Sequence, residues 1–368
     1  MIILKTTQNK ILSILQSVSG IVERRHTMPI LANILIQKIG GKVHFMTSDL
    51  EIQIKTSAQF DGVDGDFSTT IGARKVIDIL RSIDSEQNVS FESSKDKVVL
   101  KGGKSRFTLQ TMPAEDFPSM KETSPFGSSF TLSQKTLKQL MNQVSFSMAV
   151  HDIRYYLNGI LFVVENNELR LVATDGHRLA YSSSKLDIDI PKQEVILPRK
   201  TVLELSRLLN DNDDTISISF ATNQAKFVFN EIEFVSKLVE GKFPDYNRVI
   251  PKKQNNTVLI DRVSLLSCLQ RTAILTSDKF KGVRINIEPN ILKVTSTNAE
   301  QEEASDEIEI EYSGEKIEIG FNVTYLIDVL LNMNQKLISF DLPDSSSSAL
   351  ITIPEDSSFK YVVMPMRI

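Results

Sequence analysis

The sequence predicts an α+β protein built from three tandem repeats of about 125 residues, because three markers recur at that spacing. They are a strand that leads into an amphipathic helix, a second amphipathic helix, and a late strand with an aromatic residue. The second helix occurs in GARKVIDILRSI, LPRKTVLELSRLL and NVTYLIDVLLNM, whose matching residues are Ala73, Pro198 and Val323. The late strands carry Phe107, Phe234 and Tyr361. Independent markers at one spacing indicate that each repeat is one structural unit.

The first helix of each repeat has its apolar residues on one face. In the second repeat these are spaced i, i+3, i+4 and i+7, which is typical of a buried helical stripe. They are Leu137, Leu140, Met141 and Val144. The matching sets are Ile11, Ile14, Leu15 and Val18, and Leu265, Cys268, Leu269 and Thr272. We therefore expect this helix to pack on a sheet in all three repeats.

Short alternating segments fill the rest of each repeat. Ile216, Ile218 and Phe220 alternate with polar residues, which predicts half-buried strands. Two helices and about eight strands per repeat fit helices packed on one face of antiparallel sheet. Turn formers at 124–128 and 251–256 mark the boundaries, giving repeats 1–126, 127–253 and 254–368. The serine run 345–348 is expected to be a hairpin loop inside the third repeat.

Composition excludes several classes of protein. The 368 residues are 41% hydrophobic and 24% charged, as in folded globular proteins. The single cysteine, Cys268, cannot form an internal disulfide, and with four histidines it cannot build a cysteine-rich zinc cage, so we expect no metal. No glycine-rich nucleotide fingerprint is present, so we expect no cofactor. Neither a signal peptide nor a membrane span is evident, which favours the cytoplasm.

Basic residues gather on the polar sides of the predicted helices, although the formal net charge is -4. They are Lys10, Arg74, Lys75, Arg81, Lys135, Lys138, Arg199, Lys200, Arg207, Arg262 and Arg271. Any one of them could simply solvate an amphipathic helix. As a set, they predict a basic face that attracts phosphates without reading bases.

The segment LVATDGHRLAY carries the arrangement that most resembles a catalytic site. Asp175 and His177 could act as a base and its orienting carboxylate. Asp-Gly between alternating runs is instead the typical signal of a hairpin turn, which we favour. The basic face favours a nucleic-acid-binding protein, but two alternatives stay open. One is a hydrolase that uses Asp175 and His177, and the other is a monomeric repeat scaffold that binds no nucleic acid.

The segments RYYLNGILF, ATDGHRLA, GKFPDYNRVIP and FNVTYLIDVL and the ending YVVMPMRI resemble the bacterial DNA polymerase III β subunit family, the replicative sliding clamps. The resemblance covers essentially the whole chain. It implies a non-catalytic, head-to-tail homodimeric ring of six clamp domains around duplex DNA, with helices on the inner face and antiparallel sheets outside. The implied partners are the replicative polymerase catalytic subunit, the clamp loader, and other polymerases and repair proteins with short Gln, Leu and Phe motifs.

Domain size agrees with this resemblance. A domain of about 125 residues has a radius of roughly 18 Å, so six touching domains leave a hole roughly 36 Å across. B-DNA, at roughly 20 Å, passes through such a hole with a hydrated gap. Three repeats per chain then require a dimer.

The resemblance also assigns candidate residues. The pocket for partner peptides is an adaptable apolar groove, formed by Leu157, Thr174, Gly176, His177, Arg178, Leu179, Pro244, Arg248, Val249, Phe280, Asn322, Tyr325, Ser346, Ser348, Val362, Val363, Met364, Pro365 and Met366. The DNA contacts are Arg25, His151, Tyr155, Tyr156 and Lys200. The subunit boundary pairs Lys104, Arg106, Phe107 and Leu109 with Ile274, Leu275, Glu300, Glu302 and Glu303.

Overall fold

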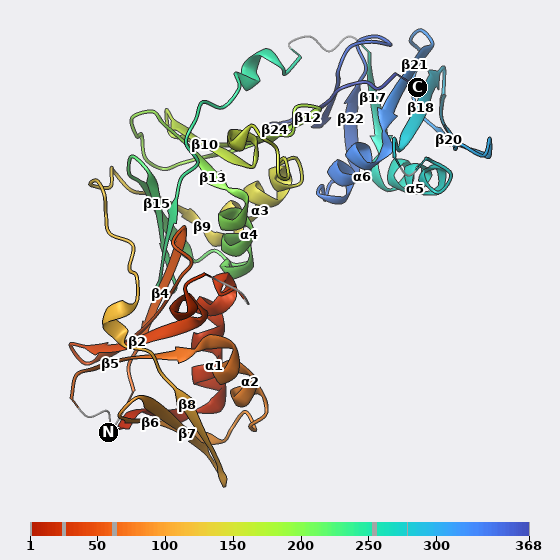
Figure 1. The fold of residues 1–368 in the computed structure, drawn as a ribbon. Coiled ribbons are helices and arrows are strands. Elements are labelled where there is room, and N and C mark those ends of the chain that lie inside the picture. Colours follow the sequence, from red (N-terminus) through yellow and green to blue (C-terminus); the bar gives the residue numbers. More distant parts are fainter. Residues whose placement is uncertain (1, 24–26, 61–64, 252–255, 278, 368) are drawn as a thin grey trace. The chain divides into compact units, whose positions relative to one another are not determined.

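The computed structural model describes residues 2–23, 27–60, 65–251, 256–277 and 279–367 (Figure 1). The described part of the chain contains six α-helices and twenty-four strands, and the same element order occurs three times. The first repeat contains β1 (Ile2–Thr7), α1 (Gln8–Val18), β2 (Asn33–Ile39), β3 (Lys42–Ser48), β4 (Ile52–Ala58), β5 (Phe67–Gly72), α2 (Ala73–Arg81), β6 (Asn88–Ser94), β7 (Lys97–Gly102) and β8 (Ser105–Gln110). This confirms the prediction of two helices and about eight strands.

The second and third repeats follow the same order. The second contains β9 (Phe130–Ser133), α3 (Gln134–Ser145), β10 (Gly159–Glu165), β11 (Glu168–Thr174), β12 (Arg178–Lys185), β13 (Gln193–Pro198), α4 (Arg199–Leu208), β14 (Thr215–Phe220), β15 (Gln224–Phe229) and β16 (Ile232–Lys237). The third contains β17 (Thr257–Asp261), α5 (Arg262–Ala273), β18 (Gly282–Glu288), β19 (Ile291–Thr297), β20 (Glu303–Glu309), β21 (Ile317–Asn322), α6 (Val323–Leu331), β22 (Leu337–Asp341), β23 (Ala349–Ile353) and β24 (Asp356–Val363).

The strands pair antiparallel in four sheets. Two have four strands, in the orders β1-β6-β7-β8 and β20-β19-β18-β21. Two have eight strands, in the orders β13-β10-β11-β12-β24-β23-β22-β17 and β5-β2-β3-β4-β16-β15-β14-β9. Each eight-stranded sheet therefore joins four strands from one repeat to four from the next.

One rule describes both joints. The eighth strand of a repeat pairs with the fourth strand of the repeat before it: β16 pairs with β4, where Phe234 lies opposite Ile54, and β24 pairs with β12, where Tyr361 lies opposite Ala180. By the same count, β8 is an eighth strand and β20 a fourth strand. Each of them ends its four-stranded sheet without a further partner among the described strands.

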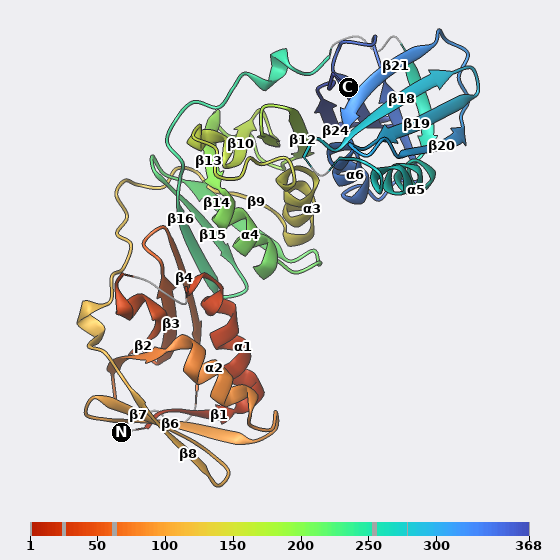
Figure 2. The ribbon, with the colours of Figure 1, turned by 45° about the vertical axis from the view of Figure 1, so that its right-hand side comes forward.

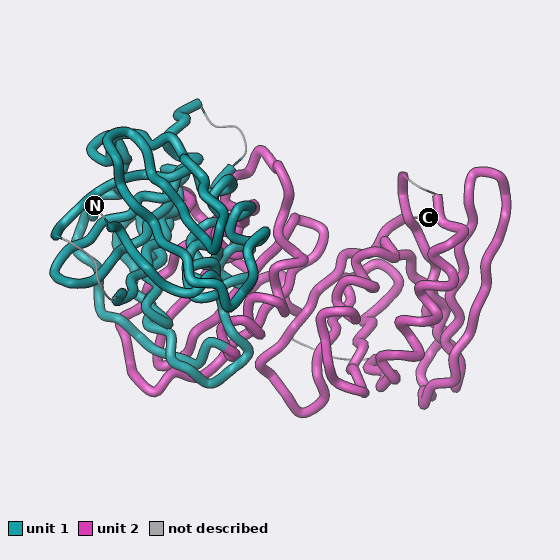
Figure 3. The backbone as a smooth tube through the Cα atoms, turned by 90° about the horizontal axis from the view of Figure 1, so that it is seen from below, with its two compact units in different colours: residues 1–134, 203–238 teal, residues 135–202, 239–368 magenta. Residues whose placement is uncertain are grey.

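The contacts within the chain define two compact units (Figure 3). Unit 1 comprises residues 1–134 and 203–238, and unit 2 comprises residues 135–202 and 239–368. The second repeat thus contributes to both units, because its two sheets continue into different neighbours. The predicted boundary at 124–128 lies in coil, whereas 252–255 lie outside the described residues. The repeat limits 1–126, 127–253 and 254–368 stay a prediction.

The helices cover the sheets as their apolar stripes predict. In unit 1, α1 packs on α2, β3 and β4; in unit 2, α5 lies beside α6 and packs on β19 and β20 (Figure 2). All predicted stripe residues are buried except Ile14, which stays partly exposed. At 100° per residue Ile14 and Leu15 lie at the two edges of this stripe, and only the edge that carries Ile14 is partly exposed. No helix in the described residues is long and apolar enough to cross a membrane.

Candidate functional site

A mainly apolar cavity of about 240 Å³ opens on unit 2. It is lined by Arg154, Tyr156, Leu157, Thr174, Gly176, His177, Arg178, Leu179, Pro244, Tyr246, Val249, Ser348, Val362 and Met364. Most of these residues belong to the peptide pocket proposed from the sequence. They come from the segment before β10, the β11–β12 hairpin, the segment after β16, the β22–β23 loop, and β24 with the residue that follows it. The pairing of β12 with β24 brings the hairpin and the end of the chain together.

The β11–β12 turn forms one wall of the cavity. Asp175 Oδ1 accepts hydrogen bonds from the backbone N–H groups of His177 (2.9 Å) and Arg178 (3.0 Å). Gly176 has φ +92°, which favours glycine. The hairpin interpretation of this segment is confirmed. The Asp175 carboxylate thus organises the backbone of the turn, and the His177 side chain is exposed.

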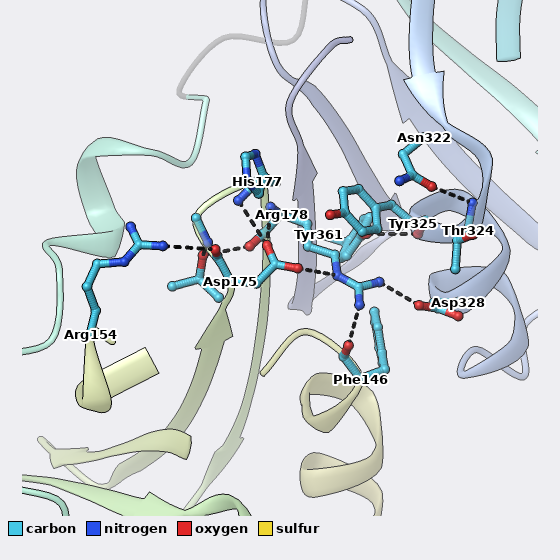
Figure 4. Close-up of polar contacts among 12 residues, drawn as sticks. Phe146, Arg154, Asp175, His177, Arg178, Asn322, Thr324, Tyr325, Asp328 and Tyr361 are labelled. Carbon is cyan, nitrogen blue, oxygen red and sulfur yellow. Dashed lines mark hydrogen bonds and ion pairs between the residues drawn. The ribbon is translucent and has the colours of Figure 1, made fainter. Parts of the chain in front are cut away.

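Arg178 connects this turn to the third repeat (Figure 4). Its side chain is 10% exposed, and its guanidinium donates to Asp175 Oδ2 (3.1 Å), Asp328 Oδ2 (2.6 Å) and the Phe146 carbonyl oxygen (2.6 Å). The guanidinium carbon lies 4.4 Å from the centre of the Tyr325 ring. Burial alone would lower the pKa of Arg178, but Tyr361 and the two carboxylates outweigh it and raise the pKa. The arginine is therefore a fixed cation under the turn.

The end of the chain forms the adjoining wall. The Met364 N–H donates to the His177 carbonyl oxygen (2.9 Å), and the Met366 N–H donates to Gly320 (2.7 Å). Val363, the last residue of β24, is fully buried. Met364 lines the cavity with 48% of its surface exposed, whereas Met366 is not among the lining residues.

Arg154 stands at the rim and was missed by the sequence analysis. It donates to Asp152 through Nε (3.0 Å) and Nη2 (2.8 Å), and this pairing lowers the pKa of Asp152 to about 2. Tyr246 was missed as well, and Tyr156 was assigned to DNA rather than to the pocket. A signal was present, because Arg154 and Tyr246 lie in the RYYLNGILF and GKFPDYNRVIP segments that carry the resemblance.

The remaining pocket candidates lie outside the cavity lining. Tyr325 stacks on Arg178, and Asn322 caps α6 by accepting the Thr324 N–H (2.9 Å). Ser346 binds Asp344 in the β22–β23 loop, which confirms that the serine run is a hairpin loop. The others are Arg248, which pairs with Asp245, the exposed Phe280, the buried Val363, and the half-buried Pro365 and Met366.

The DNA candidates are spread over several segments. His151, with φ +56°, and Tyr155, 74% exposed, lie in the segment that precedes β10. Tyr156 follows Tyr155 in a short 3₁₀ turn, Tyr155–Leu157, and lines the cavity. Lys200 is half-buried at the start of α4. Arg25 lies outside the described residues.

The basic helix residues are only partly open to a ligand. Arg262 donates to the carbonyl oxygens of Gln335 (2.8 Å) and Leu330 (2.9 Å), so it fastens α5 to the end of α6. Its assignment to an open basic face is a correction to the sequence analysis. Other arginines of the set have acidic partners: Arg271 with Asp306, Arg207 with Glu204, and Arg74 and Arg81 with Asp78.

The candidates for the subunit boundary lie on and beside the free edges. Lys104 and Arg106 are exposed next to and on β8, and Glu300, Glu302 and Glu303 are exposed next to and on β20. Ile274, at the end of α5, is 77% exposed, and Leu275 is half-buried. Phe107 is half-buried, and Leu109 is 9% exposed, so its side chain already belongs to the core of its own sheet.

No group of three or more His, Cys, Asp or Glu side chains in the described ranges is arranged to hold a metal ion. The cavity therefore offers a buried cation, backbone groups and apolar walls. This chemistry suits the binding of an apolar peptide segment with a few polar anchors.

Comparison with known proteins identifies the family. Family models of the DNA polymerase III beta subunit match in order: the N-terminal domain over residues 2–121, the central domain over 131–245 and the C-terminal domain over 247–367. The chain is 43% identical to the beta sliding clamp of Pseudomonas aeruginosa and 41% identical to that of Escherichia coli K12, in each case over 96% of both proteins.

Solved structures agree with the sequence matches. A sliding clamp from Pseudomonas aeruginosa bound to griselimycin has a TM-score of 0.96 and 40% identity, with 100% of both chains covered. Caulobacter crescentus pol III beta has a TM-score of 0.93 and 33% identity, with 99% of this chain and 100% of that chain covered. These matches favour a sliding clamp, which is not an enzyme, over a hydrolase built on Asp175 and His177. The chain belongs to the DNA polymerase III beta subunit family, the beta sliding clamps.

Proposed function

We propose that two copies of this chain close head to tail into a ring of six clamp domains around duplex DNA, and that the ring makes the replicative polymerase processive. The cavity in unit 2 binds short peptide segments of the polymerase, the clamp loader and other replication and repair proteins. Residues Arg25, His151, Tyr155, Tyr156 and Lys200 contact DNA. The ring acts in the cytoplasm.

The strand-pairing rule carries the proposal for the ring. Two eighth strands, β16 and β24, pair with the fourth strand of the repeat before, and β8 and β20 are the eighth and fourth strands left without such a partner among the described strands. A second copy supplies each of them with the partner that the rule requires. Such a contact joins two different surfaces of the chain. It gives a closed ring of two copies when the rotation that relates one copy to the next, applied twice, returns to the first copy.

The charges at the two edges support the same pairing. Lys104 and Arg106 accompany β8, whereas Glu300, Glu302 and Glu303 accompany β20. The exposed Ile274 lies close to the acidic edge in the third repeat, since α5 packs on β20. An apolar centre flanked by opposite charges is typical of a specific interface.

The composition of the helices supports contact with phosphates. None of α1, α3 and α5 contains an acidic residue, and each carries Lys or Arg. Loose phosphate contacts weaken steeply as salt increases, so a protein that depended on them alone would leave DNA in high salt. A closed ring is held by its topology instead.

The cavity supports the tethering of partners. Leu157, Leu179, Pro244 and Val362 give it apolar walls, and Met364 adds a flexible thioether that can fit different side chains. The relative from Pseudomonas aeruginosa that binds griselimycin shows that a member of this family takes a ligand.

Retention on circular and linear DNA tests the ring. Protein loaded on nicked circular duplex by a clamp loader is moved into 0.5 to 1 M salt, and the bound fraction is followed by gel filtration. We expect retention on the circle and rapid loss after one restriction cut. Equal retention on circular and linear DNA would contradict the proposal, as would loss from both in high salt.

A further inference from the structure

We propose that Asp328 on α6 is a positioning residue for the cavity. Its carboxylate holds the Arg178 guanidinium, and Arg178 in turn fixes the 174–178 turn that lines the cavity. Asp328 itself is not among the lining residues. The inference rests on the function proposed above, in which the cavity binds peptides.

The first step is that Asp328 stands on a firm element. Val323, Leu326, Val329 and Leu330 of α6 are buried, and Asn322 caps its first turn. The backbone N–H (3.2 Å) and side-chain amide (2.9 Å) of Asn332 both donate to the carbonyl oxygen of Asp328. The backbone that carries the Asp328 carboxylate is therefore fixed independently of the turn.

The second step is that the carboxylate has no role in its own helix. Asp328 lies in the last turn of α6, where the helix dipole disfavours an acidic side chain. The last turn of α6 contains no basic residue that could compensate for the Asp328 charge. The placement is explained by Arg178, whose Nη1 lies 2.6 Å from Asp328 Oδ2.

The third step is that all three guanidinium nitrogens of Arg178 donate hydrogen bonds. Nη1 contacts Asp328, Nε contacts Asp175, and Nη2 contacts the Phe146 carbonyl oxygen. The group is planar and rigid, so its contacts are coupled in direction. Without the Asp328 carboxylate, the buried cation keeps Asp175 as its carboxylate partner and can rotate toward it.

The fourth step carries that movement into the cavity wall. The other oxygen of Asp175 accepts the backbone N–H groups of His177 and Arg178, and the Thr174 hydroxyl donates to the Arg178 carbonyl oxygen (2.6 Å). The His177 carbonyl oxygen also accepts the Met364 N–H. Displacement of Asp175 therefore moves both the turn and the C-terminal wall of the cavity.

The test compares full-length Asp328→Asn with the unchanged protein. A fluorescein-labelled peptide that contains Gln, Leu and Phe reports affinity by fluorescence polarisation, and hydrogen exchange reports the mobility of residues 174–178. We expect binding at least about tenfold weaker, which corresponds to about 1.4 kcal/mol, and faster exchange in the turn. Asp328→Glu keeps the charge, so it should bind within about threefold of the unchanged protein. Asp78→Asn removes a helical acid that pairs with Arg74 in unit 1, and it should change neither readout.

The outcomes separate this inference from the proposed function. If the unchanged protein does not bind the peptide, the proposed role of the cavity is wrong. If it binds and Asp328→Asn binds equally well, or binds weakly without faster exchange at 174–178, the role of Asp328 is wrong. Should Asp328→Asn fail to fold, hydrogen exchange on the unchanged protein tests the inference instead. Bound peptide should slow amide hydrogen exchange at residues 328–332 as well as at 174–178. Slower exchange at 174–178 alone would overturn the inference.

Discussion

The backbone N–H of Met364 donates to the carbonyl oxygen of His177 across 2.9 Å, and so joins the end of β24 to the β11–β12 turn. Two residues later, the Met366 N–H is bound to Gly320. Pro365, between them, has no N–H to donate. The last residues are thus fastened along the cavity after the sheet itself has ended at Val363.

Deletion of residues 364–368 should weaken peptide binding strongly and leave the fold and the proposed dimer intact. The deletion spares β24 but removes Met364, the cavity residue of this segment. Its side chain is one apolar contact at about 1.5–3 kcal/mol of a micromolar affinity of about 8 kcal/mol, and its N–H is the donor that holds the His177 carbonyl oxygen. Fluorescence polarisation measures the loss, and sedimentation measures the dimer. Arg367→Ala, which changes one exposed side chain in the same segment, is the control. Tight binding by the truncated protein would place the partner site elsewhere.

Gly176→Ala should strain the turn. At φ +92° a side chain costs about 1–2 kcal/mol, and the added Cβ would lie 3.2 Å from the Arg154 guanidinium. We expect a lower midpoint of thermal unfolding and weaker peptide binding. Gly41→Ala is the matched control, because Gly41 has φ +86° with no atom within 4 Å of the added Cβ. The control should lose similar stability and bind normally; equal loss of binding in both variants would argue against a local effect.

Replacing Ile274 and Leu275 together with Ala should separate the proposed dimer. Ile274 is 77% exposed in the single chain, so each copy is expected to bury it on association, at about 1.5–3 kcal/mol per side chain. We expect monomers at micromolar concentration in analytical ultracentrifugation. Ile39→Ala, at a residue that is 59% exposed in unit 1, should leave the mass unchanged. A dimer of normal affinity in the double variant contradicts the assigned boundary.

Cys268 should resist thiol reagents while the chain is folded. Burial, with a contribution from Asp306, raises the pKa of the thiol from 9.0 to about 12. Because the folded pKa is the higher one, the thiol's contribution to stability is complete below pH 9 and falls as the pH rises from 9 towards 12. Ellman's reagent at pH 8 should label the native protein far more slowly than the denatured protein. Native labelling at the rate of a free cysteine would contradict the burial of Cys268.

Local periodicity was sufficient to predict the helices and the alternating strands, and the Asp-Gly dipeptide between two such strands predicted the β11–β12 turn. The stripe that ends in Val144, for example, depends only on spacings within one helix. Ile14 is the exception, since the same spacing does not say how wide the buried stripe is. The pocket residues at 174–179 came from the resemblance to the family and not from periodicity.

The remaining features depend on contacts that have no local signature. Arg178 meets Asp328 only because β24 pairs with β12, and no periodicity specifies which strand edges meet. Tyr155 and Tyr156 are neighbours with different surroundings, because the 3₁₀ turn sends one into solvent and the other to the cavity. The resemblance to the family assigned both to DNA contact.

The free edge of β20 bears on the associations that the chain should avoid as well as on the dimer proposed above. Exposed strand edges are templates for aggregation unless something discourages wrong partners. β20 carries Glu303, Asp306, Glu307 and Glu309, so alignment of this edge with the same edge of another copy would set carboxylates against carboxylates. Repulsion between like charges therefore disfavours pairing of this edge with itself, and with it the growth of fibres through like-to-like sheets.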